Sequence, residues 1–188
     1  KRLKQAQDNA ALLTTFIVIP VVTKMSKELG KKKAFIISQG ISVFGYILFW
    51  FLFIPGKPIY FLYALPFFSF GIGGLFTLMM SMTADVCDLD ELNNGAPRKE
   101  ATFGAIYWLM VKFGFAISGL LSGLIMSVVG FVPNAPEQPE DAVYWLRVIY
   151  TIFPIIGTLL AIFVMRNYEI SESKAKEIRA ELKVKKSA

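Results

Sequence analysis

Charged residues are bunched along the chain and leave long apolar segments between them. Four uncharged runs contain 18 to 27 residues each, at 34–56, 58–84, 113–136 and 148–165. About 20 apolar residues cross a hydrocarbon core roughly 30 Å thick, and a soluble core helix rarely stays uncharged over such a length. The pattern therefore predicts an all-α integral membrane protein.

Five membrane helices are predicted, because a shorter apolar run near the N-terminus joins the four long ones. This run covers Asn9 to Thr23 and has only 15 residues, so we interpret it as the rest of a helix that begins upstream. We expect a transmembrane bundle over 1–168 and a tail over 169–188. The expected spans are about 9–23, 34–54, 58–82, 102–130 and 144–165, with a tight Pro55-Gly56-Lys57-Pro58 turn between the second and third.

The distribution of Lys and Arg predicts how the bundle is oriented. Fourteen basic residues lie in segment 24–33, in the loop 85–100 and in the tail from Arg166, whereas five lie on the other side. Cytoplasmic loops carry the excess of Lys and Arg in membrane proteins. We therefore expect a multi-pass protein of the cell membrane with a cytoplasmic C-terminus and an outward-facing N-terminus.

The tail has two open interpretations. Ala175, Ile178 and Leu182 recur at helical spacing, which favours a short amphipathic helix on the cytoplasmic surface. A solvated, frayed segment is the alternative. Neither interpretation gives the tail a chemical role.

Composition excludes several classes of protein. Hydrophobic residues make up 55% of the chain, histidine is absent, and Cys87 is the only cysteine. A zinc site would lack its His and Cys ligands, and a nucleophilic serine would lack its histidine base. A disulfide scaffold would lack a second cysteine. The net charge of +6 is explained more simply by membrane topology than by nucleic-acid binding. We expect no enzyme activity, no cofactor and no nucleic-acid partner.

Lys112 is the one charged residue that falls well inside a predicted span. A buried lysine costs about 2.5–3.5 kcal/mol to insert, and such residues usually face a bundle interior or a wet cavity. Its helix face carries small residues that would let another helix approach closely, so we expect the ammonium to point into protein. Snorkelling of the side chain toward the interface is the alternative. The residues of this face are Ala105, Trp108, Ala116, Gly119 and Gly123.

Two further motifs have both a structural and a functional interpretation. Gly71-Ile72-Gly73-Gly74 faintly resembles a phosphate loop, but it lies inside a span without the preceding strand, so close helix packing is favoured. The predicted inner loop has Asp85, Asp88, Asp90 and Glu91 facing Arg98 and Lys99. It is either solvated surface or a latch that breaks when the cytoplasmic side opens.

Several motifs along the chain form a specific set. They are Ala84 to Leu92, then Gly95, Arg98 and Glu100, then Lys112-Phe113-Gly114, and then Gly130 to Asn134. This set resembles the second half of the glycoside–pentoside–hexuronide:cation symporter family of the major facilitator superfamily, which the basic loop Lys27 to Lys32 matches more modestly. The resemblance implies that the spans are helices eight to twelve of a twelve-helix fold.

The resemblance also implies roles for residues along the predicted cavity. Lys112 matches a lysine beside the coupling-cation site, and Tyr107, Trp108 and Val111 match the stretch that lines the sugar and cation cavity. Phe76 matches a sugar-facing aromatic residue. Trp108 departs from melibiose-type carriers, which have threonine there and hence a hydroxyl near the cation.

Charged residues of the inner loop match the cytoplasmic gate of the family. They are Asp85, Asp88, Glu91 and Arg98, which would stabilise the closed inner side. The loop is one residue longer than the family pattern around Ala96-Pro97.

The function implied is sugar symport with Na⁺ or H⁺ by alternating access. The expected partners are a small sugar, membrane lipid and a missing N-terminal six-helix half that holds the main acidic cation ligands. No metal site is expected within this chain beyond a transported Na⁺. Two alternatives remain: a sodium-coupled lysolipid transporter of the same superfamily and a membrane scaffold that transports nothing.

Overall fold

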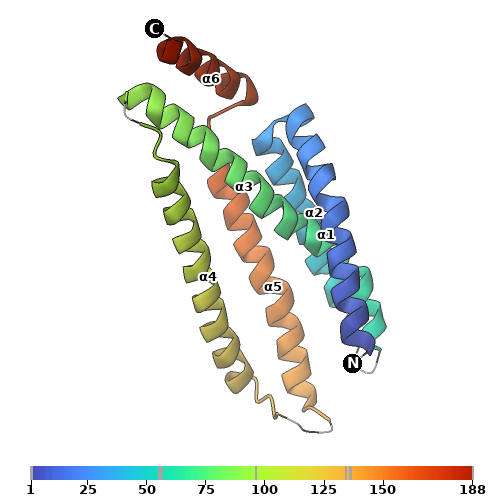
Figure 1. The fold of residues 1–188 in the computed structure, drawn as a ribbon. Helices are drawn as coiled ribbons and strands as arrows, with labels where there is room; N and C mark the ends of the chain where they lie inside the picture. Colours follow the sequence, from blue (N-terminus) through green and yellow to red (C-terminus); the bar gives the residue numbers. More distant parts are fainter. Residues whose placement is uncertain (1, 55–56, 96, 134, 136, 188) are drawn as a thin grey trace.

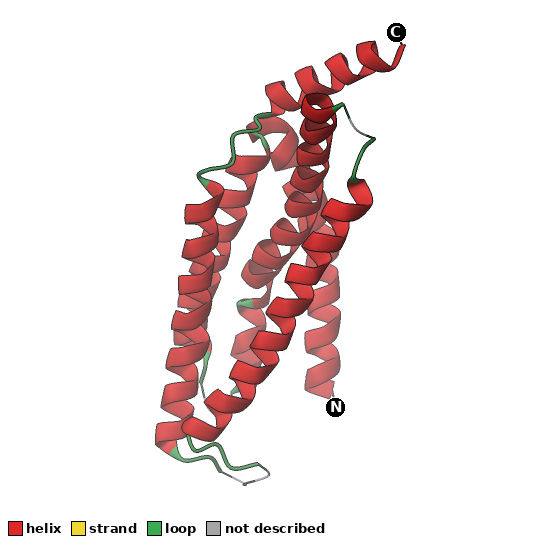
Figure 2. Cartoon of the chain, turned by 90° about the vertical axis from the view of Figure 1, so that its left-hand side faces the viewer, coloured by secondary structure: helices red, strands yellow, loops and turns green. Residues whose placement is uncertain are grey.

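The computed structural model describes residues 2–54, 57–95, 97–133, 135 and 137–187, without the side chains of residues 2–13, 15 and 58. Throughout these residues the regular structure is helical, which confirms the predicted all-α fold (Figure 2). The elements are α1 (Arg2–Leu29), α2 (Lys31–Leu52), the 3₁₀ helix η1 (Pro58–Tyr63), α3 (Leu65–Asn94), α4 (Glu100–Val128), α5 (Glu140–Met165) and α6 (Glu172–Ser187).

The long helices form a bundle from which α4 stands partly apart (Figure 1). Helix α3 packs against α1 and α2, α5 packs against α2, and α4 contacts α3 more sparsely. Helix α6 lies across one end of the bundle, where α1 joins α2 and where α3 ends (Figure 1). We call this the α6 end; the N-terminus and the start of α5 lie at the opposite end.

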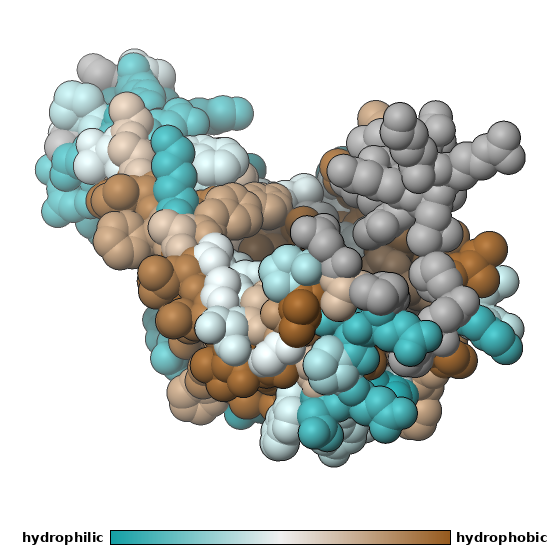
Figure 3. All heavy atoms as spheres, turned by 90° about the horizontal axis from the view of Figure 1, so that it is seen from below, coloured by the Kyte–Doolittle hydropathy of each residue, from teal (hydrophilic) through white to brown (hydrophobic). Residues whose placement is uncertain are grey.

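Four helices among the described residues are long and apolar enough to cross a membrane, namely α2, α3, α4 and α5. Many of their large apolar side chains are exposed, as in the stripe of Met110, Phe113 and Leu120 on α4. Seen from the end opposite α6, hydrophobic side chains occupy much of the outer surface (Figure 3). Such a surface suits contact with lipid or with further helices rather than with water.

Glycines at the α2–α3 contact allow the two backbones to approach closely. A Cβ added at Gly71 would lie 2.3 Å from Ser42 Oγ, and one at Gly74 would lie 2.6 Å from Ser38 Cβ. Gln39 Nε2 donates a hydrogen bond of 3.0 Å to the carbonyl oxygen of Gly71 across the same contact. The prediction that this glycine motif serves helix packing is therefore confirmed.

The third membrane helix differs from the predicted span 58–82 at both ends. Its first residues form η1, and α3 begins at Leu65, with Pro66 in its first turn, where no intrahelical N–H is needed. At the other end α3 continues to Asn94 and stops at Gly95, whose φ of +62° suits a glycine C-cap. Placing Asp85 to Glu91 in a loop was therefore wrong. Pro55, Gly56, Ala96 and Asn134, which belong to predicted turns and motifs, lie outside the described residues.

An arginine links α5 to the last turn of α2 at the end opposite α6. Arg147 Nη2 donates to the carbonyl oxygen of Trp50, and its guanidinium carbon lies 4.5 Å from the centre of the Trp50 ring. A cation near a helix C-terminus is favoured by the helix dipole, and guanidinium groups stack well on indole rings. Arg147 therefore joins two helices in addition to contributing to the charge distribution.

Candidate functional site

Helices α3 and α4 bring three of the predicted cavity residues together. The rings of Phe76 and Trp108 are stacked with centroids 6.4 Å apart and planes inclined by 23°. The ring of Tyr107 meets that of Trp108 edge to face at 5.4 Å. Val111 follows one turn later on α4 and is half-buried. Phe76, Tyr107 and Trp108 thus form one aromatic wall at the α3–α4 contact.

Lys112 lies one turn beyond Trp108 on α4. Its side chain is exposed and forms no hydrogen bond or ion pair with the residues that the structure describes. A Cβ added at Gly119 or Gly123, on the same helix face, would meet no atom within 4 Å. Apart from the contact of Trp108, which stacks on Phe76 of α3, the residues of this face are exposed among the described residues, so a close approach of another helix to Lys112 and the two glycines stays a prediction.

Helix α4 has three distinct faces around this lysine. Phe103, Tyr107 and Ser122 belong to the half-buried side that turns toward the rest of the bundle. At about 100° per residue, the lysine face is displaced by roughly 120° from this side, and the apolar stripe by the same amount in the other direction. Beyond Trp108, the lysine face is therefore left exposed by the described helices.

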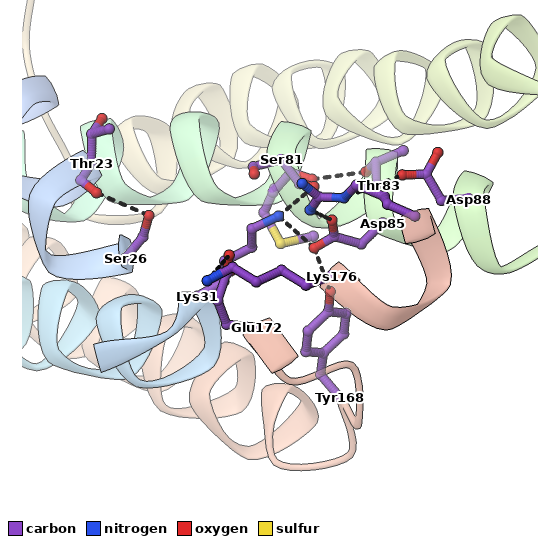
Figure 4. A network of polar contacts seen from close by, with 12 residues as sticks. Thr23, Ser26, Lys31, Ser81, Thr83, Asp85, Asp88, Tyr168, Glu172 and Lys176 are labelled. Carbon is purple, nitrogen blue, oxygen red and sulfur yellow. Dashed lines mark hydrogen bonds and ion pairs between the residues drawn. The ribbon is translucent and has the colours of Figure 1, made fainter. Parts of the chain in front are cut away.

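Asp85 is the centre of an ion-pair cluster at the α6 end. Its side chain is buried, and Lys31 Nζ from the start of α2 contacts Oδ2 while it also donates to the Ser81 carbonyl oxygen at 3.2 Å. Arg179 Nη2 of α6 lies 2.9 Å from Asp85 Oδ1, and Tyr168 Oη lies 3.4 Å from Oδ2. Figure 4 shows Lys31 and Tyr168 reaching the carboxylate from separate elements. One buried carboxylate thus joins α2, α3 and α6.

The remaining predicted gate residues extend this cluster along α3. Arg98 Nη2 lies 3.4 Å from Asp88 Oδ1, and Arg179 Nε lies 3.7 Å from the other oxygen of Asp88; the role of these pairs as a latch stays a prediction. Glu91 Oε1 lies 2.8 Å from Lys186 Nζ of α6. The three carboxylates recur every three residues, so they lie along one side of the helix.

Tyr168 follows α5 and contributes the hydroxyl next to Asp85. Burial raises the pKa of this phenol, and the neighbouring Asp85 carboxylate raises it further. The hydroxyl therefore keeps its proton at physiological pH and can donate to the carboxylate.

Sequence reasoning missed the cations that α2 and α6 contribute to this cluster. The sequence predicted partners within the α3–α4 connection, whereas Lys31, Arg179 and Lys186 come from α2 and α6. The buried Ala175, Ile178 and Leu182 show that the tail takes the amphipathic-helix alternative. The tail, for which no chemical role was expected, contributes Arg179 and Lys186 to the ion pairs of this cluster. The sequence did contain a signal for this contact: Arg179 and Lys186 are spaced so that they lie on the same side of a helix as Leu182.

The chemistry available here is binding and ion pairing. Among the described residues, no group of three or more His, Cys, Asp or Glu side chains could hold a metal ion. What the arrangement offers is an aromatic wall beside an uncovered lysine and, at one end of the bundle, an ion-pair cluster that spans three helices.

Comparison with known proteins identifies the family. The sequence profile of the family described as MFS/sugar transport protein matches residues 2–172. The chain belongs to this family. Its members and the relatives below are named as transporters or carriers rather than enzymes, and the resemblance to glycoside–pentoside–hexuronide symporters is confirmed.

Individual relatives cover most of the chain. A glucuronide carrier protein homolog of Escherichia coli is 29% identical over 171 residues, which are 91% of this chain and 37% of that protein. An isoprimeverose transporter of Lactiplantibacillus pentosus is 25% identical over 87% of this chain and 34% of its own length. A sodium-dependent lysophosphatidylcholine symporter of Mus musculus is 29% identical over 56% of this chain and 20% of its own length. The chain thus spans about a third of the length of the first two relatives.

Proposed function

We propose that this chain is part of a sugar transporter that carries a small glycoside together with Na⁺ or H⁺ by alternating access. The observation that carries the proposal is the aromatic wall of Phe76, Tyr107 and Trp108 next to the uncovered Lys112. Aromatic faces suit the apolar C–H faces of a sugar ring, while neighbouring polar groups bind its hydroxyls. Relatives named for a glucuronide and for isoprimeverose support a sugar as the substrate.

Lys112 is proposed to couple the ion to the sugar. An ammonium cannot stabilise a bound cation directly because like charges repel. It would instead pair with a carboxylate or polar group on the segment that covers the lysine face, and the coupling cation would compete for that group. Ion binding would then neutralise a charged site and permit the two halves of the transporter to reorient.

The α6 end is proposed to be cytoplasmic and to carry the inner gate. Fourteen of the twenty Lys and Arg residues lie at that end: five in segment 24–33, where α1 meets α2, two in the connection from α3 to α4, and seven in segment 166–187, which includes α6. The gate residues Asp85, Asp88, Glu91 and Arg98 would hold the inner side closed and separate when it opens.

Uptake into membrane vesicles tests the coupling role. The full-length protein should accumulate a radiolabelled glucuronide or isoprimeverose against its gradient when a Na⁺ or H⁺ gradient is imposed. Lys112→Val should abolish this accumulation without reducing the amount of protein in the membrane. Lys57→Gln, which removes an exposed lysine from the connection before η1, is the matched control. Normal gradient-driven uptake by Lys112→Val would refute the coupling role and favour snorkelling.

A lysolipid is the second candidate substrate, because a relative is named as a sodium-dependent lysophosphatidylcholine symporter. Labelled lysophosphatidylcholine in the same vesicles distinguishes the two. Uptake of the lysolipid and not of sugars would favour this second function. Failure to transport either would favour the scaffold alternative, for which Lys112 is dispensable.

A further inference from the structure

Helix α6 is seated along the last turns of α3 by a matched apolar surface. Its buried Ala175, Ile178 and Leu182 form a cluster against which Val86 and Leu89 pack from α3. The chain reaches this position directly, since only six residues separate Met165, the end of α5, from Glu172. The contact is small, because it involves one side of a helix of 16 residues.

Basic side chains of α6 complete the contact by pairing with the acidic side of α3. Arg179 bridges Asp85 and Asp88, with Nη2 at 2.9 Å from the first carboxylate and Nε at 3.7 Å from the second. Two turns later Lys186 pairs with Glu91 at 2.8 Å. Apolar and charged positions of the two helices are therefore complementary along the same stretch.

The segment before α6 also binds α2. Lys32 Nζ donates to the carbonyl oxygens of Arg166 and Tyr168, at 2.6 and 3.0 Å. Lys31 pairs with Asp85, so the adjacent residues Lys31 and Lys32 of α2 bind both the α3 carboxylate and the segment that leads into α6. Separation of α2 from α3 at this end would therefore disturb α6.

We propose that α6 is a releasable strap that keeps the α6 end of the transporter closed, and that Arg179 is the positioning residue through which it acts. The inference rests on the proposed function, to which it adds an element outside the α3–α4 connection. In the closed state Arg179 forms ion pairs with Asp85 and Asp88, and these ion pairs must break before this end can open.

The exposure of the strap residues suits release. The side chains of Arg179 and Lys186 are 47% and 63% exposed, whereas that of Asp85 is only 3% exposed. Water and salt reach the cationic ends of these ion pairs, so Arg179 and Lys186 can exchange their carboxylate partners for water more readily than a buried lysine can. The buried Lys31–Asp85 pair is the more permanent half of the cluster.

Thiol labelling of the full-length protein tests the strap. In a background with Cys87→Ala, Leu89→Cys reports the surface under α6, and Val86→Cys is a second reporter should the first variant fold poorly. Gly123→Cys reports the lysine face toward the opposite end, where a Cβ meets no atom within 4 Å. Labelling rates are measured in sealed vesicles of both orientations, with and without Arg179→Gln.

Arg179→Gln should raise the labelling rate of Leu89→Cys by about fivefold or more, and should lower that of Gly123→Cys, because the population shifts toward the state open at the α6 end. Lys176→Gln is the matched control, since among the described residues the ion pair of Lys176 lies within α6, with Glu172 at 4.0 Å. This control should change neither rate.

Two results would overturn the strap. If Leu89→Cys is labelled faster while Gly123→Cys is unchanged, α6 only covers a surface and does not bias the transport cycle. If neither labelling rate changes, Arg179 is an ordinary solvated side chain that does not keep the α6 end closed. The test does not depend on the substrate, so uptake by the same vesicles decides the proposed function separately. Loss of uptake in the unmodified protein, with the labelling shift intact, would contradict the sugar assignment and leave the strap standing.

Discussion

Replacement of Gly71 by alanine tests how closely α2 and α3 approach. The new Cβ would lie 2.3 Å from Ser42 Oγ and 2.6 Å from Ser42 Cβ, and the Ser42 side chain is itself buried. Relief of this overlap to an ordinary contact requires the helices to separate by about 1 Å, and overpacking of this kind costs about 1–3 kcal/mol. Because alanine gains up to about 1 kcal/mol over glycine in helix propensity, we expect a net loss of about 1–2 kcal/mol.

The melting temperature of the purified full-length protein in detergent measures this loss, which should amount to a few degrees. Gly40→Ala on α2 is the matched control, because a Cβ there meets no atom within 4 Å, and it should melt at or above the temperature of the unmodified protein. Ser42→Gly removes both overlapping atoms, so the double variant should be more stable than the sum of the single changes predicts. Equal melting of Gly71→Ala and Gly40→Ala would show that the two helices are not in close contact.

Two further predictions concern the sidedness and the opposite end of the bundle. Single cysteines at Lys33 and Lys57, in a Cys87→Ala background, should be labelled from opposite faces of sealed vesicles, and labelling from one face would contradict the membrane crossing of α2. Arg147→Lys should lower the melting temperature, because an ammonium cannot both stack flat on the Trp50 ring and reach the Trp50 carbonyl oxygen. The control Lys57→Gln should leave the melting temperature unchanged. Equal melting temperatures of the two variants would show that the α2–α5 link contributes nothing measurable to stability.

The helices of this fold were largely predictable, because charge and apolar runs determine where a chain can cross a membrane. Helices α2, α4 and α5 begin and end within four residues of the spans predicted at 34–54, 102–130 and 144–165. The exceptions are α1, which runs from Arg2 to Leu29 where the span 9–23 was predicted, and α3, whose last turns carry Asp85 and Glu91. The acidic residues there were interpreted as a sign of a loop. This stretch, however, has no glycine or proline before Gly95, and its carboxylates form ion pairs with neighbouring helices.

The candidate site was predictable only in part. Motif resemblance selected Phe76, Tyr107 and Trp108, which the structure brings into ring contact. It could not reveal that Lys31 and Arg179 meet at Asp85, because these residues are 54 and 94 positions away in sequence. Tertiary packing brings these residues together, and the periodic spacing of residues along the sequence does not indicate such a long-range contact.

Asp85→Asn offers the strictest test of the ion-pair cluster. The substitution removes a buried charge that two cations share, and the Lys31 side chain, only 11% exposed, keeps its own charge. Breaking a buried pair by removing one partner costs about 3–5 kcal/mol, and we expect the lower part of that range, since Lys31 still reaches the Ser81 carbonyl oxygen and Arg179 can turn to water. The melting temperature should therefore fall clearly more than in Asp90→Asn, which breaks the more exposed pair with Lys99 at 3.2 Å. Addition of Lys31→Met should restore part of the loss, because the uncompensated charge is then gone. Equal melting of Asp85→Asn and Asp90→Asn would mean that the Asp85 carboxylate is hydrated and that α2, α3 and α6 are not held together through it.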